Sequence, residues 1–234
     1  DFVGSGDTVI DPALLTWYKD TYVMDPVEKT GFDGNYWKWE HPNYNRAYMV
    51  VADVARGDGS DYSTFQVIDI EDSSQVAEYR GKIETKDFGN FLVAVSTEWN
   101  NALLIIENSN VGWATIQQAI DRGYGNLFYM SNDLKYIDVE KQMSNKFYRD
   151  EKKLVAGFGT TIKTRPLIIS TLDTYINNKD ILIRSQRLID ELFTFIWSGG
   201  RAEAMKGYND DLTMALAIGL WVRNTALRLK QEGI

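Results

Sequence analysis

The chain has 234 residues, of which 44% are apolar and 25% charged, and its formal net charge is −8, a composition typical of a globular protein with one sizeable core. It contains no cysteine and one histidine, His41, which excludes disulfides and thiolate metal sites and leaves little room for a histidine zinc cluster. No apolar run approaches the roughly 20 residues of a membrane span, so no membrane partner is expected.

The first 45 residues are expected to be an N-terminal extension. The chain begins without an initiator Met or a targeting pattern, so we expect a fragment of a longer protein. The pair Asp11-Pro12 predicts the start of a helix, with Pro at its first position. Residues 25–45 mix Pro and Gly with aromatic residues, which is typical of a loop-rich segment that packs its rings onto a main domain at 46–234.

Three strands with short connections open the main domain. Alternating apolar side chains, bounded by turn residues, predict strands at 46–54, 63–70 and 75–83. Consecutive strands joined by short turns run antiparallel, so these three form a meander.

Helices and strands alternate after the meander. Apolar residues at helical spacing predict amphipathic helices at 85–100 and 111–122. Residues 103–107 form a nearly continuous apolar run, as in a buried central strand, and residues 127–130 predict a fifth strand.

The last hundred residues are predicted to be mainly helical. Residues 131–162 are polar, basic and irregular, and we interpret them as a hairpin or flexible excursion. Helices are expected at 165–177 and 185–195, and Asn209 is expected to cap a final helix that packs into the core. The whole order predicts an α/β fold whose mixed five-stranded sheet, a meander followed by parallel strands, is flanked by helices.

Positive charge gathers in one segment. Residues 135–165 hold eight basic and four acidic side chains, a net charge of +4, so the rest of the chain carries −12. Such a patch can hold a polyanion, and the alternative is a solvated surface segment. Phe147, Tyr148 and Phe158 could stack on bases, although hydrophobic packing is the better interpretation.

Two acidic side chains end apolar strands. Asp53 closes the first strand of the meander on the face of Met49 and Val51, and Glu107 closes the fourth strand. A buried ionised carboxylate is costly unless a positive partner compensates it. Ligand sites of open α/β sheets lie beyond the carboxyl ends of the strands, where these two residues could meet if their strands are adjacent and parallel.

Further acidic side chains stand where they could join them. Asp210 and Asp211 open the last helix, whose N-terminus favours an ionised carboxylate, and Asp61 follows Asp53 across a glycine-rich hairpin. Taken singly, these are ordinary residues of helix starts and turns. Taken together, they predict a carboxylate site for a hard ion such as Mg²⁺ or Mn²⁺.

The motifs around these acids resemble a known family. The strand ending in Val51-Ala52-Asp53, the strand Ile105-Ile106-Glu107-Asn108 and the helix start Gly207-Tyr208-Asn209-Asp210-Asp211 are similar to the RNase H-like nuclease domain of phage large terminases, in particular those of T-even-type tailed phages. The most specific similarity is Ala52-Asp53-Val54-Ala55-Arg56-Gly57 with Asp61-Tyr62-Ser63. It extends from about Arg46 to the end of the chain.

The resemblance implies an endonuclease that cuts concatemeric viral DNA at the start and end of head filling. Asp53, Glu107 and Asp211 match the catalytic metal ligands, Asp210 is the alternative to Asp211, and Asp61 matches an auxiliary acid. Two Mg²⁺ or Mn²⁺ ions would be the cofactors. The absence of a Gly-x-x-x-x-Gly-Lys-Ser/Thr motif indicates that this chain does not hydrolyse ATP.

The same resemblance implies partners and a location. Double-stranded DNA, the portal protein, the small terminase subunit and an ATPase domain of the same parent chain are expected, in the host cytoplasm at the prohead portal. The residues expected to grip DNA backbones are the cations of the basic segment: Lys141, Lys146, Arg149, Lys152, Lys153, Lys163 and Arg165. A junction resolvase or transposase core and a non-catalytic docking module remain alternatives.

Overall fold

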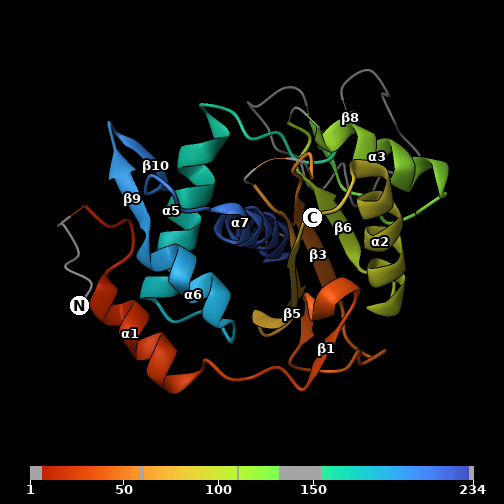
Figure 1. Ribbon diagram of the computed structural model, residues 1–234. Coiled ribbons are helices and arrows are strands. Elements are labelled where there is room, and N and C mark those ends of the chain that lie inside the picture. Colours follow the sequence, from red (N-terminus) through yellow and green to blue (C-terminus); the bar gives the residue numbers. More distant parts are fainter. Residues whose placement is uncertain (1–6, 58, 60, 110, 132–153, 232–234) are drawn as a thin grey trace.

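The computed structural model describes residues 7–231 except residues 58, 60, 110 and 132–153, and it has three layers (Figure 1). A twisted sheet stands in the middle, with α7 and the helices α5 and α6 on one side and α2 and α3 on the other. The bounds of these helices are Thr85–Glu98 (α2), Gly112–Asp121 (α3), Thr164–Asn177 (α5), Gln186–Phe193 (α6) and Asp211–Gln231 (α7). Among the described residues, none of the helices combines the length and hydropathy of a membrane-spanning segment.

The central sheet is mixed. Its strands lie in the order β1-β2-β5-β4-β3-β6, and all neighbours are antiparallel except β3 and β6, which are parallel. The bounds are Glu28–Thr30 (β1), Tyr36–Lys38 (β2), Tyr48–Asp53 (β3), Ser63–Asp69 (β4), Ser74–Gly81 (β5) and Leu103–Ile106 (β6). The predicted mixed α/β architecture is confirmed, including the meander β3-β4-β5 and the parallel strand that follows it.

The prediction of five strands is wrong, because the sheet has six. The segment expected to be loop-rich supplies β1 and β2, two three-residue strands joined through the short 3₁₀ helix η1 (Phe32–Gly34). Strands this short, set among Gly, Pro and aromatic residues, carry no visible alternation. The predicted fifth strand, β7 (Tyr129–Ser131), joins β8 (Leu154–Ala156) in a separate two-stranded sheet, so the ends of the expected excursion form a hairpin.

The predicted helices are confirmed with small shifts at their ends. The first is α1 (Pro12–Thr21), which is capped by the Asp11 side chain as expected. The final helix is buried through most of its first half, from Leu212 to Leu220, as its apolar circumference predicts. Gly219 permits its close approach to the sheet, because a Cβ atom there would lie 2.8 Å from Cγ2 of Val51.

Each face of the sheet has its own hydrophobic core. Met49, Val51, Ile68 and Ile105 point towards α5, α6 and α7. The alternating residues point towards α2 and α3, where Trp99 and a cluster of aromatic rings fill the interior. The period of two along β3 therefore directs Asp53 to the α7 side, together with Met49 and Val51.

One hairpin was not predicted. β9 (Phe195–Ser198) and β10 (Arg201–Ala204) pair through a two-residue turn at Gly199 and Gly200, both of which have positive φ. The helix expected at 185–195 is α6, which ends at Phe193, and Phe195 belongs to β9. The hairpin stands beside α5 at the edge of the molecule (Figure 1).

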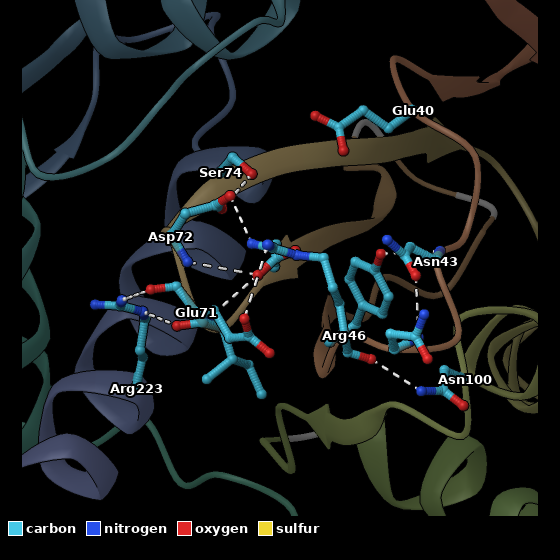
Figure 2. Close-up of polar contacts among 12 residues, drawn as sticks. Glu40, Asn43, Arg46, Glu71, Asp72, Ser74, Asn100 and Arg223 are labelled. Atoms are coloured by element: carbon cyan, nitrogen blue, oxygen red, sulfur yellow. Dashed lines mark hydrogen bonds and ion pairs between the residues drawn. The ribbon is translucent and has the colours of Figure 1, made fainter.

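The end of the sheet where β3 begins is closed by ion pairs (Figure 2). Arg46 binds Asp69, and its Nη2 atom lies 2.6 Å from Oδ2 of Asp72. Arg223 of α7 donates to the carbonyl oxygens of Ile70 at 2.7 Å and Glu71 at 3.1 Å. At this end of the sheet, Arg46 therefore neutralises the acidic side chains of Asp69 and Asp72.

Candidate metal centre

The parallel pair of strands brings Asp53 and Glu107 to the same edge of the sheet. β3 and β6 are in register at Ala52 and Ile106, so the two strands end together. The amide of Glu107 donates to the carbonyl of Ala52 at 2.9 Å and extends the ladder by one bond. The expectation that the two strands are adjacent and parallel is confirmed.

The turn after β6 fixes the backbone of Glu107. A Cβ atom at Gly112 would lie 1.9 Å from the carbonyl oxygen of Glu107, so only glycine allows α3 to start this close to the strand end. Asn108 donates its amide to Phe158 at 2.9 Å and its side chain to Ala156 at 3.0 Å, which ties the segment after β8 to the same edge. Glu107 is therefore held between two elements rather than lying on a free loop.

The start of α7 distinguishes Asp210 from Asp211. Asp211 Oδ2 accepts the amide of Tyr62 at 3.1 Å, while Asp210 Oδ2 is paired with Nη2 of Arg165 at 3.1 Å. The helix begins at Asp211, and its first backbone bond is accepted by the carbonyl of Asp210. The prediction that Asn209 caps the helix is therefore wrong: Asn209 lies one residue too early, and its side chain donates to Asp211 at 3.3 Å.

The acids from the three elements line one cavity of about 560 Å³. Asp53, Glu107, Asp211 and Asp61 all contribute to its wall, and Asp210 does not. Neither Asp53 nor Glu107 has a hydrogen bond or ion pair from its side chain to any described residue. Two strand ends, the loop after β3 and a helix start thus meet at one cavity.

The electrostatics of the cavity oppose ionisation of Asp53 and Asp211. Burial raises the pKa of Asp53 well above its usual range, and the charges of Glu107 and Asp211 raise it further. Burial also raises the pKa of Asp211 to about 6, although the hydrogen bond from the Tyr62 amide lowers it. Nearby negative charge without a compensating cation is the environment that a bound metal ion reverses.

The donor set fits a hard divalent cation. The wall offers carboxylate oxygens from four residues and no sulfur or imidazole, and Mg²⁺ and Mn²⁺ prefer such ligands. Within the described parts of the chain, no three acidic or histidine side chains are grouped closely enough to hold one ion as they stand. Because ionised carboxylates repel each other, an ion that enters this cavity has to draw the side chains together.

The predicted DNA-binding cations are only partly described. Lys141, Lys146, Arg149, Lys152 and Lys153 lie outside the described residues, as do Phe147 and Tyr148. Of the remaining residues, Lys163 is exposed. Arg165 lines the cavity and binds both Asp210 and the carbonyl of Ala202, at 2.8 Å. Phe158 is fully buried, with its ring 5.6 Å from that of Trp221, so its packing interpretation is confirmed.

Sequence reasoning missed two further arginines. Arg56 in the loop after β3 and Arg201 of β10 line the carboxylate cavity, and both are exposed. Arg56 stands inside the motif that carries the resemblance and could have been identified there. Arg201 gave no signal, because the hairpin that carries it was not predicted.

A buried acid behind the cavity was also missed. Glu191 of α6 is only 5% exposed, and its Oε2 atom accepts the amide of Thr213, in the first turn of α7, at 3.0 Å. It therefore caps the helix that presents Asp211. Burial raises the pKa of Glu191 to about 8, despite this hydrogen bond and the charge of Arg80.

No protein-family profile matches the chain, whereas solved structures share its fold. The large terminase nuclease from thermophilic phage G20c with bound magnesium has a TM-score of 0.67 at 18% identity, over 92% of this chain and 97% of that chain. The same nuclease with bound cobalt has a TM-score of 0.66 at 17% identity, over the same shares. The large terminase nuclease domain of Thermus phage P74-26 has a TM-score of 0.59 at 18% identity, over 88% of this chain and 92% of that chain.

These comparisons confirm the predicted fold class. At such identities the likeness concerns the fold, and it extends over nearly the whole of the chain. The chain therefore has the RNase H-like fold of the phage large terminase nucleases.

Proposed function

We propose that the chain is the metal-dependent endonuclease domain of a viral DNA-packaging terminase. The observation that carries the proposal is the convergence of Asp53, Glu107 and Asp211 on one cavity at the carboxyl ends of two parallel strands. The fold supports it, because solved nucleases with bound magnesium or cobalt share it. The arginines on the rim of the cavity suit a phosphodiester substrate.

In this proposal the carboxylates hold two divalent ions, Mg²⁺ or Mn²⁺. Asp53, Glu107 and Asp211 would hold these ions, with Asp61 as an auxiliary ligand. Bound divalent ions supply an activated water and stabilise negative charge on the phosphate under attack. Asp210 is paired with Arg165 and is not a ligand in this proposal. Its role is to fix the start of α7.

The remaining residues of the cavity orient the substrate. Arg56 and Arg201 are exposed on the rim and bind phosphate oxygens on either side of the cleaved bond. The amide of Tyr62 and the side chain of Asn209 keep one oxygen of Asp211 in place, so that its other oxygen faces the cavity. Histidine has no part in this chemistry, which fits a chain with one histidine.

The wider context follows from the same proposal. The substrate is concatemeric double-stranded DNA, cut at initiation and at headful termination, and the cations of residues 135–165 grip its backbone without reading bases. Residues 1–45 lead from an ATPase domain of the parent chain, and this fragment has no ATPase activity. The portal protein and the small terminase subunit are the partners, in the host cytoplasm at the prohead portal.

The test is a nicking assay on supercoiled plasmid with Mg²⁺. Asp53→Asn removes one charge at nearly constant shape and is expected to lower the cleavage rate by roughly 10³-fold or more. The matched control is Asp69→Asn, which makes the same change at the other end of the sheet and is expected to keep the cleavage rate of the folded protein. Undiminished cutting by Asp53→Asn would overturn the proposal.

Metal binding gives a second, independent readout. Mg²⁺ or Mn²⁺ is expected to raise the melting temperature of the wild-type protein and of Asp69→Asn, but not that of Asp53→Asn. Equal cutting of linear and branched duplexes distinguishes a packaging nuclease from a junction resolvase of the same fold.

A further inference from the structure

A second cavity adjoins the carboxylate cavity. Its volume is about 490 Å³, within the range of about 300–1,000 Å³ that is usual for small-molecule sites. Thr160, Arg165 and Arg201 line both cavities, so the two spaces share a wall. A chain-like ligand can therefore occupy both at once.

The far side of the second cavity is apolar. Pro166 and Ile169 of α5 line it together with Trp197 of β9 and Ile162. Trp197 is 47% exposed and Ile162 is 95% exposed. Because these exposed side chains line the same cavity as Pro166 and Ile169, they form an apolar groove of the kind that marks a binding site.

The hairpin presents Trp197 in a fixed position. Trp197 pairs across the hairpin with Ala202, and its amide donates to the carbonyl of Asp7 at 2.7 Å. Arg165 anchors the opposite strand to α5 through two bonds to the carbonyl of Ala202, at 2.8 and 3.2 Å. The indole is thus carried by a strand that is held from both sides.

The positive charge of Arg201 at the shared wall favours a ligand that carries a phosphate. Arg201 is exposed, and its ion pair with Glu203 on the same strand is long, with 3.8 Å between Nε and Oε2. Its guanidinium is therefore weakly engaged and can hold a phosphate. A ligand that fits both parts of the site has a phosphate at the shared wall and a flat apolar group beyond it. A nucleotide has both.

We propose that the second cavity binds a nucleobase of the DNA strand next to the cleaved phosphate, with Trp197 as the stacking platform and Arg201 on the intervening phosphate. The inference rests on the proposed nuclease function and names the subsite beside its reacting bond. A strand whose phosphate lies at Asp53 must place its next nucleoside in an adjoining space, and this cavity is that space. Because every base has an aromatic face, such a subsite tolerates any sequence.

The base has to leave the helical stack to enter. Unstacking and unpairing cost least in single strands and at mismatches, so these substrates bind this subsite best. Trp197 therefore contributes more to the binding of a short single-stranded oligonucleotide than to that of an intact duplex.

The experiment measures the affinity of a labelled single-stranded oligonucleotide, with Ca²⁺ in place of Mg²⁺ to limit cleavage. Trp197→Ala is expected to weaken binding by roughly 5- to 150-fold, which is the usual effect of removing one stacking platform. Trp197→Phe keeps an aromatic face and restores most of the affinity. Phe32→Ala, at an aromatic residue 78% exposed in η1, is the control and leaves binding unchanged.

Two further measurements separate stacking from a structural role. An oligonucleotide without bases binds Trp197→Ala and wild type alike, because no base is present to stack. Arg201→Ala lowers the slope of binding against salt by about 0.7, whereas Trp197→Ala leaves that slope unchanged. Equal weakening by Trp197→Phe and Trp197→Ala, or the same loss with the base-free oligonucleotide, would overturn the subsite.

Failure of the subsite and failure of the nuclease proposal look different. Trp197→Ala is expected to keep the metal-induced rise in melting temperature, which Asp53→Asn loses. If the metal response is intact and Trp197 makes no difference to binding, only the subsite is wrong. If Asp53→Asn cleaves like wild type, the nuclease proposal is wrong, whatever Trp197 does.

Discussion

Acidic side chains lie near both ends of β3, in opposite circumstances. Where the strand begins, Asp69 is 1% exposed and bound to Arg46, which also contacts Asp72 (Figure 2). Where the strand ends, Asp53 and Glu107 form no ion pair among the described residues, and burial and the charge of Glu107 both raise the pKa of Asp53.

The difference shows which acids stabilise the fold and which acids weaken it. Arg46 neutralises the carboxylates of Asp69 and Asp72 in the first cluster. Arg223 binds the backbone carbonyls of Ile70 and Glu71 beside them and so attaches α7 to the end of β4. Asp53 and Glu107 of the second cluster form no ion pair among the described residues, although Arg56, Arg165 and Arg201 line the same cavity. The burial of an unpaired Asp53 lowers the stability of the metal-free protein. An acidic cluster that the fold does not neutralise points to a cation from outside the chain.

The largest effect on stability is expected at the neutralised end. Arg223→Met keeps most of the buried stem and removes the bonds to Ile70, Glu71 and the Tyr175 hydroxyl. Leaving these buried and partly buried acceptors unpaired is expected to cost about 3 kcal/mol of unfolding free energy, or roughly 6–12 °C in melting temperature. Urea denaturation measures it, and a loss below about 1 kcal/mol would contradict the structural role.

The same substitution is expected to have opposite signs at the two ends. In EDTA at pH 7.5, Asp69→Asn lowers the unfolding free energy by about 1–2 kcal/mol, because Arg46 loses its buried partner. Asp53→Asn raises it, because an uncompensated charge disappears from the cavity. The test compares the melting temperatures of the two variants with that of wild type. A loss of stability in both variants would show that Asp53 stabilises the metal-free fold as Asp69 does.

The pH dependence of stability follows from the raised pKa values. An acid whose pKa is higher in the folded state binds its proton more tightly there, so it favours folding at low pH and loses that contribution as pH rises. In EDTA, stability is therefore expected to fall from about pH 4 to about 6 through Asp211, and on towards about 8 through Glu191.

A divalent metal is expected to remove part of that fall. Metal ions bind ionised carboxylates, so stabilisation by Mg²⁺ or Mn²⁺ increases with pH over the range in which Asp211 loses its proton. Thermal melts at pH 5, 6, 7 and 8, with EDTA or with metal, measure the difference. A metal effect that is constant over this range would show that these acids do not bind the ion.

The smallest effect on stability is expected for a substitution at Glu191, behind the carboxylate cavity. Glu191 has a pKa of about 8 and is mainly protonated at pH 6, so Glu191→Gln is expected to change stability there by less than about 0.5 kcal/mol. Above pH 8 the variant is expected to be the more stable protein, because wild-type Glu191 must then ionise in a buried place. A large loss at pH 6 would show that Glu191 is charged when it caps α7.

Local patterns predicted the elements that carry the site. Period-two alternation fixed the meander and the face of Asp53, while the apolar run of β6 and the helical spacing of α7 fixed the rest of the frame. The strands that were not predicted are β1, β2, β9 and β10, and each is three or four residues long. Strands of that length are stabilised by their partners and not by a pattern of their own.

Composition and local patterns are enough to place several carboxylates at the ends of buried elements and to exclude a cysteine or histidine cluster in their place. The three-dimensional fold is needed to show that Asp211 lines the cavity while Asp210 binds Arg165, and that Arg201 and Glu191 lie nearby. Adjacent residues on a helix point about 100° apart, so their partners come from segments distant in the chain. The spacing of residues along the sequence therefore does not show which of Asp210 and Asp211 lines the cavity.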